Sequence, residues 1–592
     1  MARRRSKLPM PVHSMVDQMR NLVWCAFVLA CSSPAPKHPP GAVKHGARTL
    51  TIIGTNDLHG ALDRLPLFAG FVANIRAARA ADGGGVLLLD AGDMFQGTLE
   101  SNLGEGADVV RAYNQLGYAA VAVGNHEFDF GPEGSAVTAK SVEDDPRGAL
   151  KARVAEAKFP FLVSNINDEK TGARIKWKNM PASTTVEVAG TLVGIIGAST
   201  ESTPFTTMPA NFVGLKMAPT AQAIADEAKA LRAQGAQVIV VVAHIGSSCK
   251  EFDRPNDASS CDRKEEIFKV LGDLPHGTVD VIVAGHTHAV MAHRIADVAV
   301  IESYSSGRAF GRVDLRVTDH VSGVTIHKPE VMCPLDKDGN PAPVAECKPP
   351  AYEGKPIAPD PEIQKLVDDS IKRASKLRDE KLGPTLIGAI TKSYNTESIE
   401  GNWFTDLMLA ARPEAQVALT NGGGLRADIP AGTLTYGQLY QAMPFDNRFA
   451  VIELKGKHIR RLVTSNLQHS GGMYSWGGVS AKARCANGDL AVEIKVAGKP
   501  LADDATYKLV TSDFLATGGD ASVIGRLKLP DGAIKMTDVI IRDAIADVLR
   551  KKKGKIDPAT LLSPTNKRMD YEGKRPVECP GAKTHAPPQE PD

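Results

Sequence analysis

The chain has 592 residues, of which 43% are hydrophobic, 23% are charged and 5% are aromatic. This length is too great for one hydrophobic core, and the composition is globular, so we expect two domains with extensions. The formal net charge of +2 gives no reason to expect a nucleic acid or another polyanion as a partner, because proteins that bind them carry a clustered excess of basic residues.

The first 31 residues have the pattern of an export signal. A basic stretch precedes an apolar run, residues 22–31, which is too short to span a bilayer but suits a secretory signal. Val28-Leu29-Ala30-Cys31 resembles a bacterial lipobox, in which Cys31 would be lipidated; an ordinary cleaved signal is the alternative. Residues 32–47 would be a flexible tether. We therefore expect an exported bacterial protein, periplasmic or held at the outer membrane through a lipid anchor only.

Six further cysteines follow Cys31, and an even number in an exported protein predicts disulfide bonds. Two pairs of neighbouring cysteines each enclose a short polar loop, and we expect each of these pairs to be bonded. The two cysteines that are left over would then form the third pair. The predicted pairs are Cys249–Cys261, Cys333–Cys347 and Cys485–Cys579. A zinc cluster is the alternative, but the spacing contains no CxxC motif.

Residues 48–335 alternate between strand-like and helix-like runs. Near-continuous apolar runs alternating with helices predict an α/β sheet covered on both faces. In such sheets, ligands bind at the carboxyl ends of the strands. The predicted helix is 65–80, and the predicted strands are 50–54, 86–89, 119–123, 237–242 and 279–283.

Five short motifs follow these strands, and each carries side chains that bind metals. They are Asp57-Leu58-His59, Gly92-Asp93, Gly124-Asn125-His126-Glu127, Ala243-His244 and Gly285-His286-Thr287-His288. Together they supply ligands for two divalent metal ions and one carboxylate to bridge them. We expect Asp57, His59, Asp93 and His288 at the first metal, and Asp93, Asn125, His244 and His286 at the second. Such a set accepts Zn, Mn, Co or Fe.

A dimetal site of this kind suits phosphoester hydrolysis, because two cations neutralise the phosphate and lower the pKa of a bound water. His126 would donate a proton to the phosphoryl oxygen or the leaving group, with Asp129 orienting its ring. Each motif alone has a simpler interpretation: Asp57 and Asp93 could cap helices, and His244 could be a core residue. Jointly, in this order and at strand ends, the motifs predict the dimetal site.

The second half of the chain begins after a linker, residues 336–383. This linker includes a predicted helix, 361–381, that ends at Gly383-Pro384 and would bridge two domains. Residues 384–571 form a second α/β unit, and residues 572–592 a Pro-rich tail. The second unit contains Asn421-Gly422-Gly423-Gly424-Leu425-Arg426, Met443-Pro444-Phe445 and the stretch from Asp513 to Asp520.

Together these motifs resemble the calcineurin-like metallophosphoesterases. Thr55-Asn56-Asp57-Leu58-His59-Gly60 and Asn125-His126-Glu127-Phe128-Asp129 are the forms seen in the 5′-nucleotidase branch. The resemblance spans residues 48–571. It implies an N-terminal metallophosphoesterase β-sandwich flanked by helices over residues 48–335. A helix would join it to a C-terminal α/β substrate-binding domain over residues 384–571, and allow a large rotation between them.

The resemblance also implies roles in the second domain. Asn421 and Arg426 would contact the ribose, phosphate or base, and Asp520 would bind ribose hydroxyls. Phe445 and Phe514 would stack on the base, as aromatic faces do with any base.

Three departures from the family pattern leave the substrate open. No Arg precedes Gly401-Asn402, where Lys392 is the nearest cation; His288 stands where many nucleotidases have Gln or Asn; and Ala521 follows Asp520 where many relatives have Gly.

We therefore expect an exported dimetal phosphoesterase that converts nucleotides to nucleoside and phosphate through attack of a metal-bound hydroxide, acting as a monomer or dimer. The enzymatic alternatives are a 2′,3′-cyclic-nucleotide phosphodiesterase with 3′-nucleotidase activity and a nucleotide-sugar hydrolase; a sulfur-ester hydrolase fits the Phe pair less well. The alternative of another class is a non-catalytic secreted nucleotide-binding protein. The intact ligand set argues against it, because a decayed site should show losses.

Overall fold

The computed structural model describes residues 47–134, 136–335, 342–527 and 529–580. The predicted export signal with Cys31, and the tether up to residue 46, lie outside the described residues. Within these ranges no helix combines the length and apolar character needed to cross a membrane.

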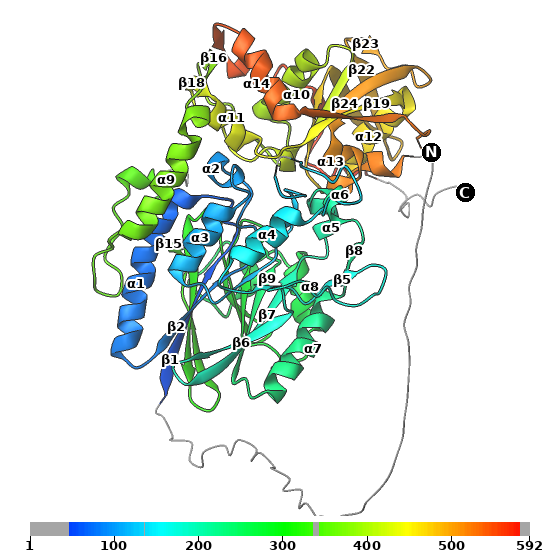
Figure 1. Ribbon diagram of the computed structural model, residues 1–592. Helices are drawn as coiled ribbons and strands as arrows, with labels where there is room; N and C mark the ends of the chain where they lie inside the picture. The colour runs from blue at the N-terminus through cyan, green and yellow to red at the C-terminus, as the bar shows by residue number, and fades with distance from the viewer. Residues whose placement is uncertain (1–46, 135, 336–341, 528, 581–592) are drawn as a thin grey trace, which may run out of the picture. The chain divides into compact units, whose positions relative to one another are not determined.

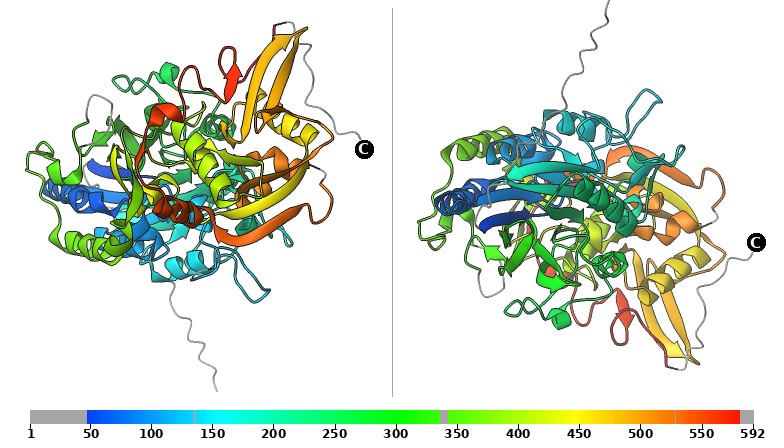
Figure 2. Two further views of the ribbon diagram at one scale, coloured as in Figure 1. Left: turned by 90° about the horizontal axis from the view of Figure 1, so that it is seen from above. Right: turned by 90° about the horizontal axis from the view of Figure 1, so that it is seen from below.

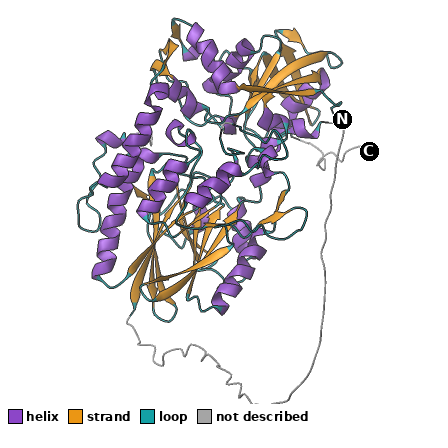
Figure 3. Ribbon diagram, in the orientation of Figure 1, coloured by secondary structure: helices purple, strands orange, loops and turns teal. Residues whose placement is uncertain are grey.

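Two sheets form the framework of the N-terminal half (Figures 1 and 3). The first has the order β14 (Val321–Ile326), β13 (Ala309–Val317), β1 (Arg48–Thr55), β2 (Gly85–Asp90), β3 (Ala120–Ala122) and β4 (Phe161–Leu162), with β15 (Glu330–Val331) paired to β13. The second has the order β11 (Val290–Ile295), β12 (Val298–Ser303), β10 (Val281–Ala284), β9 (Val238–His244), β7 (Thr191–Ser199) and β6 (Ser183–Val188). A small third sheet pairs β5 (Ile166–Asp168) with β8 (Leu215–Met217).

The two large sheets pack face to face. Leu50 and Ile52 of β1 share one buried core with Val240 and Val242 of β9. The opposite face of β1 is also buried, because Ile53 packs with residues of the flanking helices. Strands buried on both faces read as continuous apolar runs, which is why these strands could be located in the sequence. The predicted two-domain α/β fold is confirmed.

Helices cover the outer faces of this sandwich (Figure 3). The first sheet is covered by α1 (Leu65–Ala81), α3 (Ala107–Leu116) and α4 (Gly148–Glu156), and the second by α7 (Thr220–Ala233) and α8 (Glu266–Asp273). The predicted helix 65–80 is α1, and it buries Leu67, Phe71 and Ile75. Shorter helices lie in the loops: α2 (Leu99–Asn102), α5 (Thr203–Thr206) and α6 (Pro209–Phe212).

The C-terminal half contains three further sheets, drawn mostly in yellow, orange and red (Figure 2). Their orders are β18 (Gly432–Thr435), β16 (Lys381–Leu386), β26 (Lys555–Ile556); β20 (Tyr474–Gly477), β17 (Val417–Asn421), β24 (Thr506–Ser512), β19 (Arg448–Lys455), β25 (Ile534–Ile540); and β23 (Lys499–Pro500), β22 (Asp489–Val496), β21 (Val479–Ala486), β27 (Met569–Tyr571). Its helices are α10 (Ile399–Ala411), α11 (Tyr436–Ala442), α12 (Gly456–Gln468), α13 (Asp513–Ala516) and α14 (Ile541–Lys551).

The predicted bridging helix is α9 (Pro361–Arg378), and it contacts α1 and α3 of the first half and α11 of the second. It ends earlier than the predicted residue 381. Gly383 and Pro384 do not stop a helix but lie inside β16, whose residues alternate between exposed and buried. Gly383 is required there because a Cβ would collide with the backbone oxygen of Lys552. The prediction was wrong at this end because a Gly-Pro pair after a helical pattern is also the usual signal of a helix terminus.

The three predicted disulfide bonds are present. Cys485–Cys579 ties the segment after Tyr571 back to β21, and the Val577 N–H donates to the Leu467 carbonyl 2.9 Å away. Up to residue 580, the segment predicted to be a tail is therefore part of the C-terminal half.

The cap of α9 gives a test of the fold. The Asp360 carboxylate accepts hydrogen bonds from the backbone N–H groups of Glu362 at 3.0 Å and Ile363 at 2.9 Å. Asp360→Ala should lower the free energy of unfolding by about 1 kcal/mol in urea titrations, because two helix N–H groups lose their acceptor. Asp360→Asn keeps an acceptor and should lose much less; equal losses would contradict this role for the cap.

Candidate active site

Four of the five predicted motifs lie in loops that follow β1, β2, β3 and β10, and the fifth, Ala243-His244, forms the end of β9; all five are at the carboxyl ends of parallel strands. The backbone there is unusual. Asp57, His59, Asp93, His286 and His288 all have positive φ, between 49° and 80°. This region is rarely adopted by residues other than Gly, and it concentrates at functional sites because the surrounding fold must hold it in place.

Asp57, His59 and His288 form the first cluster, with one donor atom from each within 4.8 Å of the others. His288 Nε2 lies 3.3 Å from Asp57 Oδ1 and 2.9 Å from His59 Nε2. His59 Nδ1 donates to the Gln96 carbonyl at 2.7 Å. That bond fixes the tautomer and leaves the Nε2 lone pair free for a cation.

Asp93, His244 and His286 form the second cluster, within the same limit of 4.8 Å. His244 Nδ1 donates to the Ala91 carbonyl at 2.8 Å, and its Nε2 lies 3.0 Å from Asp93 Oδ2 and 3.1 Å from Asn125 Oδ1. Asp93 is 1% exposed, and its Oδ2 faces the imidazole nitrogen of His244. A buried carboxylate grouped with imidazole nitrogens offers the mixed oxygen and nitrogen donors of a metal site.

The electrostatics of both clusters also call for cations. Burial opposes ionisation of Asp93, but the charges of His244 and His126 outweigh it and hold the pKa of Asp93 well below its usual range. Burial disfavours charge on His244 as well, yet Asp93 beside it raises the pKa of His244 to about 10. A proton on His244 thus balances the buried charge of Asp93, and a bound cation would take the place of that proton.

Two buried glutamates hold the loops that carry these residues. Glu127 accepts hydrogen bonds from the backbone N–H groups of Asp93 and Met94 at 2.8 Å and Gly124 at 2.7 Å, and so joins two loops. Glu302, in β12, accepts hydrogen bonds from Ser247 N at 3.1 Å and from Thr287 Oγ1 at 2.6 Å. It therefore joins the loop after β9 to the loop after β10. Glu127 belongs to one of the five motifs, whereas Glu302 stands at the end of an apolar strand without any motif and was not predicted.

His126 and Asp129 are paired as predicted, with His126 Nδ1 2.5 Å from Asp129 Oδ2. Thr207 Oγ1 donates to Asp129 Oδ1 at 3.0 Å and fixes that carboxylate. Burial opposes charge on His126, but Asp129 and Asp93 outweigh it and raise the pKa of His126. The ring therefore favours the protonated form that a proton donor needs.

The predicted residues of the second half face the same cavity, which has a volume of about 930 Å³. Arg426 reaches across it, with a guanidinium nitrogen 3.3 Å from His59 Nε2. The ring of Phe445 lies 5.5 Å from the ring of His126. Asn421 Nδ2 donates to Asp520 Oδ2 at 3.0 Å, and Phe514 also lines the cavity.

The predicted site residues are thus brought together in one place. All of those proposed for catalysis, metal binding and substrate binding line the cavity, except Asp57 and His244. These two are fully buried directly behind the lining, in contact with His288 and Asp93 respectively.

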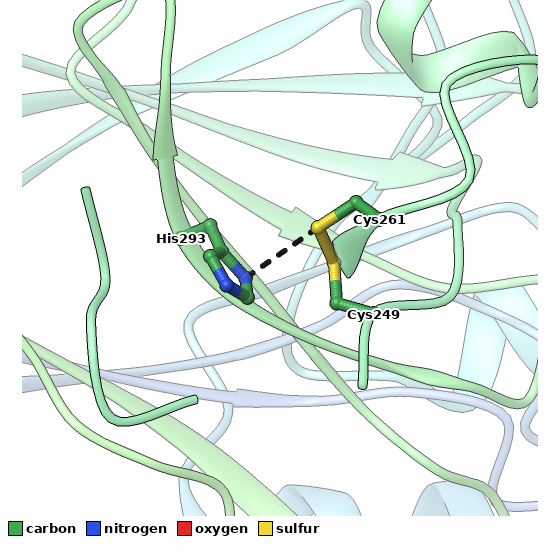
Figure 4. Close-up of side chains that lie close together, drawn as sticks. All are labelled: Cys249, Cys261 and His293. Atoms are coloured by element: carbon green, nitrogen blue, oxygen red, sulfur yellow. Dashed lines mark hydrogen bonds between the residues drawn. A yellow bond between two sulfur atoms is a disulfide. The ribbon is translucent and has the colours of Figure 1, made fainter. Parts of the chain in front are cut away.

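A third cluster, Cys249, Cys261 and His293, only looks like a metal site (Figure 4). The two sulfur atoms form a disulfide bond, and His293 Nδ1 lies 3.8 Å from the Cys261 sulfur. Metal binding requires thiolates, so the bonded pair offers no ligands.

Comparisons with known proteins agree with this geometry. Residues 50–290 match the family model for calcineurin-like phosphoesterases, and residues 381–525 match that for the 5′-nucleotidase C-terminal domain. The chain is 26% identical over 504 residues to Protein UshA of Yersinia enterocolitica, covering 80% of this chain and 86% of that protein. It is 25% identical over 544 residues to the 5′-nucleotidase of Homo sapiens, covering 80% and 84%.

The structure is also similar to that of a 5′-nucleotidase precursor from Thermus thermophilus. The TM-score is 0.67 at 25% identity, covering 88% of this chain and 99% of that one. A calcineurin-like phosphoesterase domain with clustered Asp and His ligands defines a metal-dependent phosphoester hydrolase. With the second domain matched as well, the chain belongs to the 5′-nucleotidase family.

Glu127 gives a test of how the site is held. Glu127→Gln should weaken divalent-metal binding about 10- to 100-fold, because residues that orient ligands have effects of this size. Calorimetric titration of Mn²⁺ into the metal-free protein would measure it. Glu133→Gln, at a side chain that is 66% exposed, is the matched control. Unchanged affinity in Glu127→Gln would mean that the loops hold their positions without this carboxylate.

Proposed function

We propose that the enzyme hydrolyses nucleotides to nucleoside and phosphate at a dimetal centre. One observation carries the proposal: a single cavity is lined by the Asp and His clusters on one side and by Arg426, Phe445 and Phe514 on the other. A phosphate at the clusters would therefore leave its organic group beside two aromatic rings and a guanidinium. A nucleotide has the matching parts.

The proposed ligands are Asp57, His59, Asp93 and His288 for one ion, and Asp93, Asn125, His244 and His286 for the other, with Asp93 as the bridge. The buried carboxylate of Asp93 and the mixed oxygen and nitrogen donors support two divalent ions, of Zn, Mn, Co or Fe. Such ions, when bound, neutralise the phosphate and lower the pKa of a coordinated water.

The remaining residues act through their own groups. His126, charged and oriented by Asp129, would donate a proton to the phosphoryl oxygen or the leaving group. Arg426, which lies 3.3 Å from His59, would pair with the phosphate. Phe445 and Phe514 would stack on the base, and Asn421 and Asp520, already hydrogen-bonded to each other, would meet the ribose.

We also propose that the enzyme is exported and lipid-anchored through Cys31. Three disulfide bonds support an oxidising compartment. The residues that the C-terminal half contributes to the cavity would determine which base is preferred and which ribose position carries the phosphate. Lys392 and Tyr394 line it near the place where the family pattern has an Arg, which favours 3′- or 2′,3′-cyclic nucleotides, or nucleotide sugars, as the second candidate substrates.

The test is phosphate or nucleoside release by the purified mature chain from AMP, 3′-AMP, 2′,3′-cyclic AMP and UDP-glucose, each with Mn²⁺ and with chelator. We expect chelator-sensitive turnover of AMP, abolished in Asp93→Ala, because the bridging carboxylate is lost. Preference for another member of the panel would select the second candidates. Absence of turnover by a metal-loaded protein would favour a binding role, and turnover by Asp93→Ala would refute the assigned centre.

Phe514 separates base recognition from the chemistry. Phe514→Ala should lower kcat/KM for AMP by about 10- to 100-fold, because stacking on a base contributes roughly 1–3 kcal/mol. The loss on p-nitrophenyl phosphate should be far smaller, and Phe514→Tyr should retain AMP turnover because the aromatic face remains. Equal losses on both substrates would mean that this ring does not recognise a base.

A further inference from the structure

Arg64 lines the active-site cavity and has no role in the chemistry described above. It is the residue before α1, and its stem packs on Gly307, where a Cβ would lie 3.3 Å from Arg64 Cβ. Gly307 also has a φ of +62°, which favours glycine. The close approach of these two segments holds the guanidinium at the wall of the cavity.

A second arginine, Arg308, follows Gly307 in the chain and lies near enough to Arg64 to feel its charge. Its guanidinium is 5.4 Å from the ring centre of Tyr304, and among the described residues its side-chain nitrogens donate only to Ser305, at 3.3 and 3.4 Å. Burial lowers the pKa of Arg308, and the charge of Arg64 lowers it further. Two partly buried cations thus repel each other, which is a cost that an anion between or beside them would remove.

Neither arginine forms an ion pair with a carboxylate in the part of the chain that the structure describes. Asp63, next to Arg64, lines the cavity and offsets part of the effect of burial on the pKa of Arg64, but it makes no salt bridge with it. One terminal nitrogen of Arg64 is buried and has no hydrogen-bond acceptor among the described residues. If Arg64 had only a structural role, we would expect this buried N–H group to donate to a protein acceptor.

Gln96 lines the same cavity, and its side chain also has buried polar atoms without hydrogen-bond partners. It is 2% exposed, and both its amide oxygen and its amide nitrogen have no hydrogen-bond partner in the described ranges. A buried, unpaired amide is expensive unless a ligand completes it. Its backbone carbonyl accepts the hydrogen bond from His59, so its position is tied to the first cluster.

Both groups adjoin the metal-binding loops. The N–H of Ser306, in the turn that leads to Arg308, donates to the Asp57 carbonyl at 2.7 Å, and Ser306 lines the cavity beside His288. An anion at Arg64 would therefore share the cavity with a phosphate held at the Asp and His clusters. Guanidinium groups pair well with phosphate oxygens, and an amide can add a neutral donor.

We propose that Arg64, supported by Arg308 and Gln96, is a second anion subsite that holds a phosphate group joined to the one at the metal centre, so that the cavity binds diphosphates in preference to monophosphates. The proposal rests on the metal centre proposed above, but not on the nucleoside.

The test uses p-nitrophenyl phosphate, which carries no base, as the substrate of the metal-loaded enzyme, with free Mn²⁺ held constant by a metal buffer. Phosphate and pyrophosphate are compared as competitive inhibitors, and their binding is measured separately by calorimetry. AMP and ADP form a second pair of competitors. We expect pyrophosphate to bind more tightly than phosphate, and Arg64→Gln to reduce that preference on the order of tenfold.

Arg79→Gln is the matched control, because it removes a positive charge from the last turn of α1, at the end far from Arg64, and it should leave the preference unchanged. Arg64→Lys should retain part of it, and Gln96→Leu should lower it. A change with ADP alone would assign the subsite to diphosphates carried by a nucleotide. An unchanged preference in Arg64→Gln in both pairs would overturn the proposal. If AMP is not hydrolysed but the pyrophosphate preference responds to Arg64, the nucleotidase function fails and the subsite stands.

Discussion

The convergence of buried carboxylates and imidazoles at five strand ends is the constraint on which the rest of this structure depends. Asp57 and Asp93 are 0% and 1% exposed. Burial opposes their ionisation, but the surrounding histidines outweigh it and keep the pKa of each carboxyl below its usual range. Charge in such surroundings is costly unless it is paired. The sandwich provides rigid strand ends, and the loops accept positive φ values, so that these groups are held where cations can balance them.

The supporting glutamates show how that arrangement is maintained. Glu127 joins the loops after β2 and β3 within the first sheet, and Glu302 joins the loops after β9 and β10 within the second. Burial raises the pKa of Glu127 to about 7 and that of Glu302 to about 8. In each sheet a buried glutamate thus holds a pair of neighbouring loops, while the clustered Asp and His side chains come from both sheets.

The sequence predicted the strands and the residues that cluster at their ends because both carry strong local signals. A run buried on both faces is continuously apolar, and Asp, Asn and His in a fixed order after several such runs rarely occur together except at a metal centre. Glu302 and Gln96 could not be found in this way, because their roles depend on which segments the fold brings near them. The misplaced end of α9 has a related cause: Gly383 is needed by a contact with Lys552, far along the chain, and not by the local turn.

The two halves of the chain line one cavity with different groups. The first half supplies the Asp and His clusters and the His126–Asp129 pair, whose geometry is fixed by sheet and loop. The second half supplies Arg426, which spans the cavity to reach His59, and the rings that would meet a base. Burial lowers the pKa of Arg426, whereas Asp93 and Asp57 act in the opposite direction, so the first half stabilises its charge. In the proposed function, the charge that the second half offers to a substrate would therefore depend electrostatically on the Asp and His clusters of the first half.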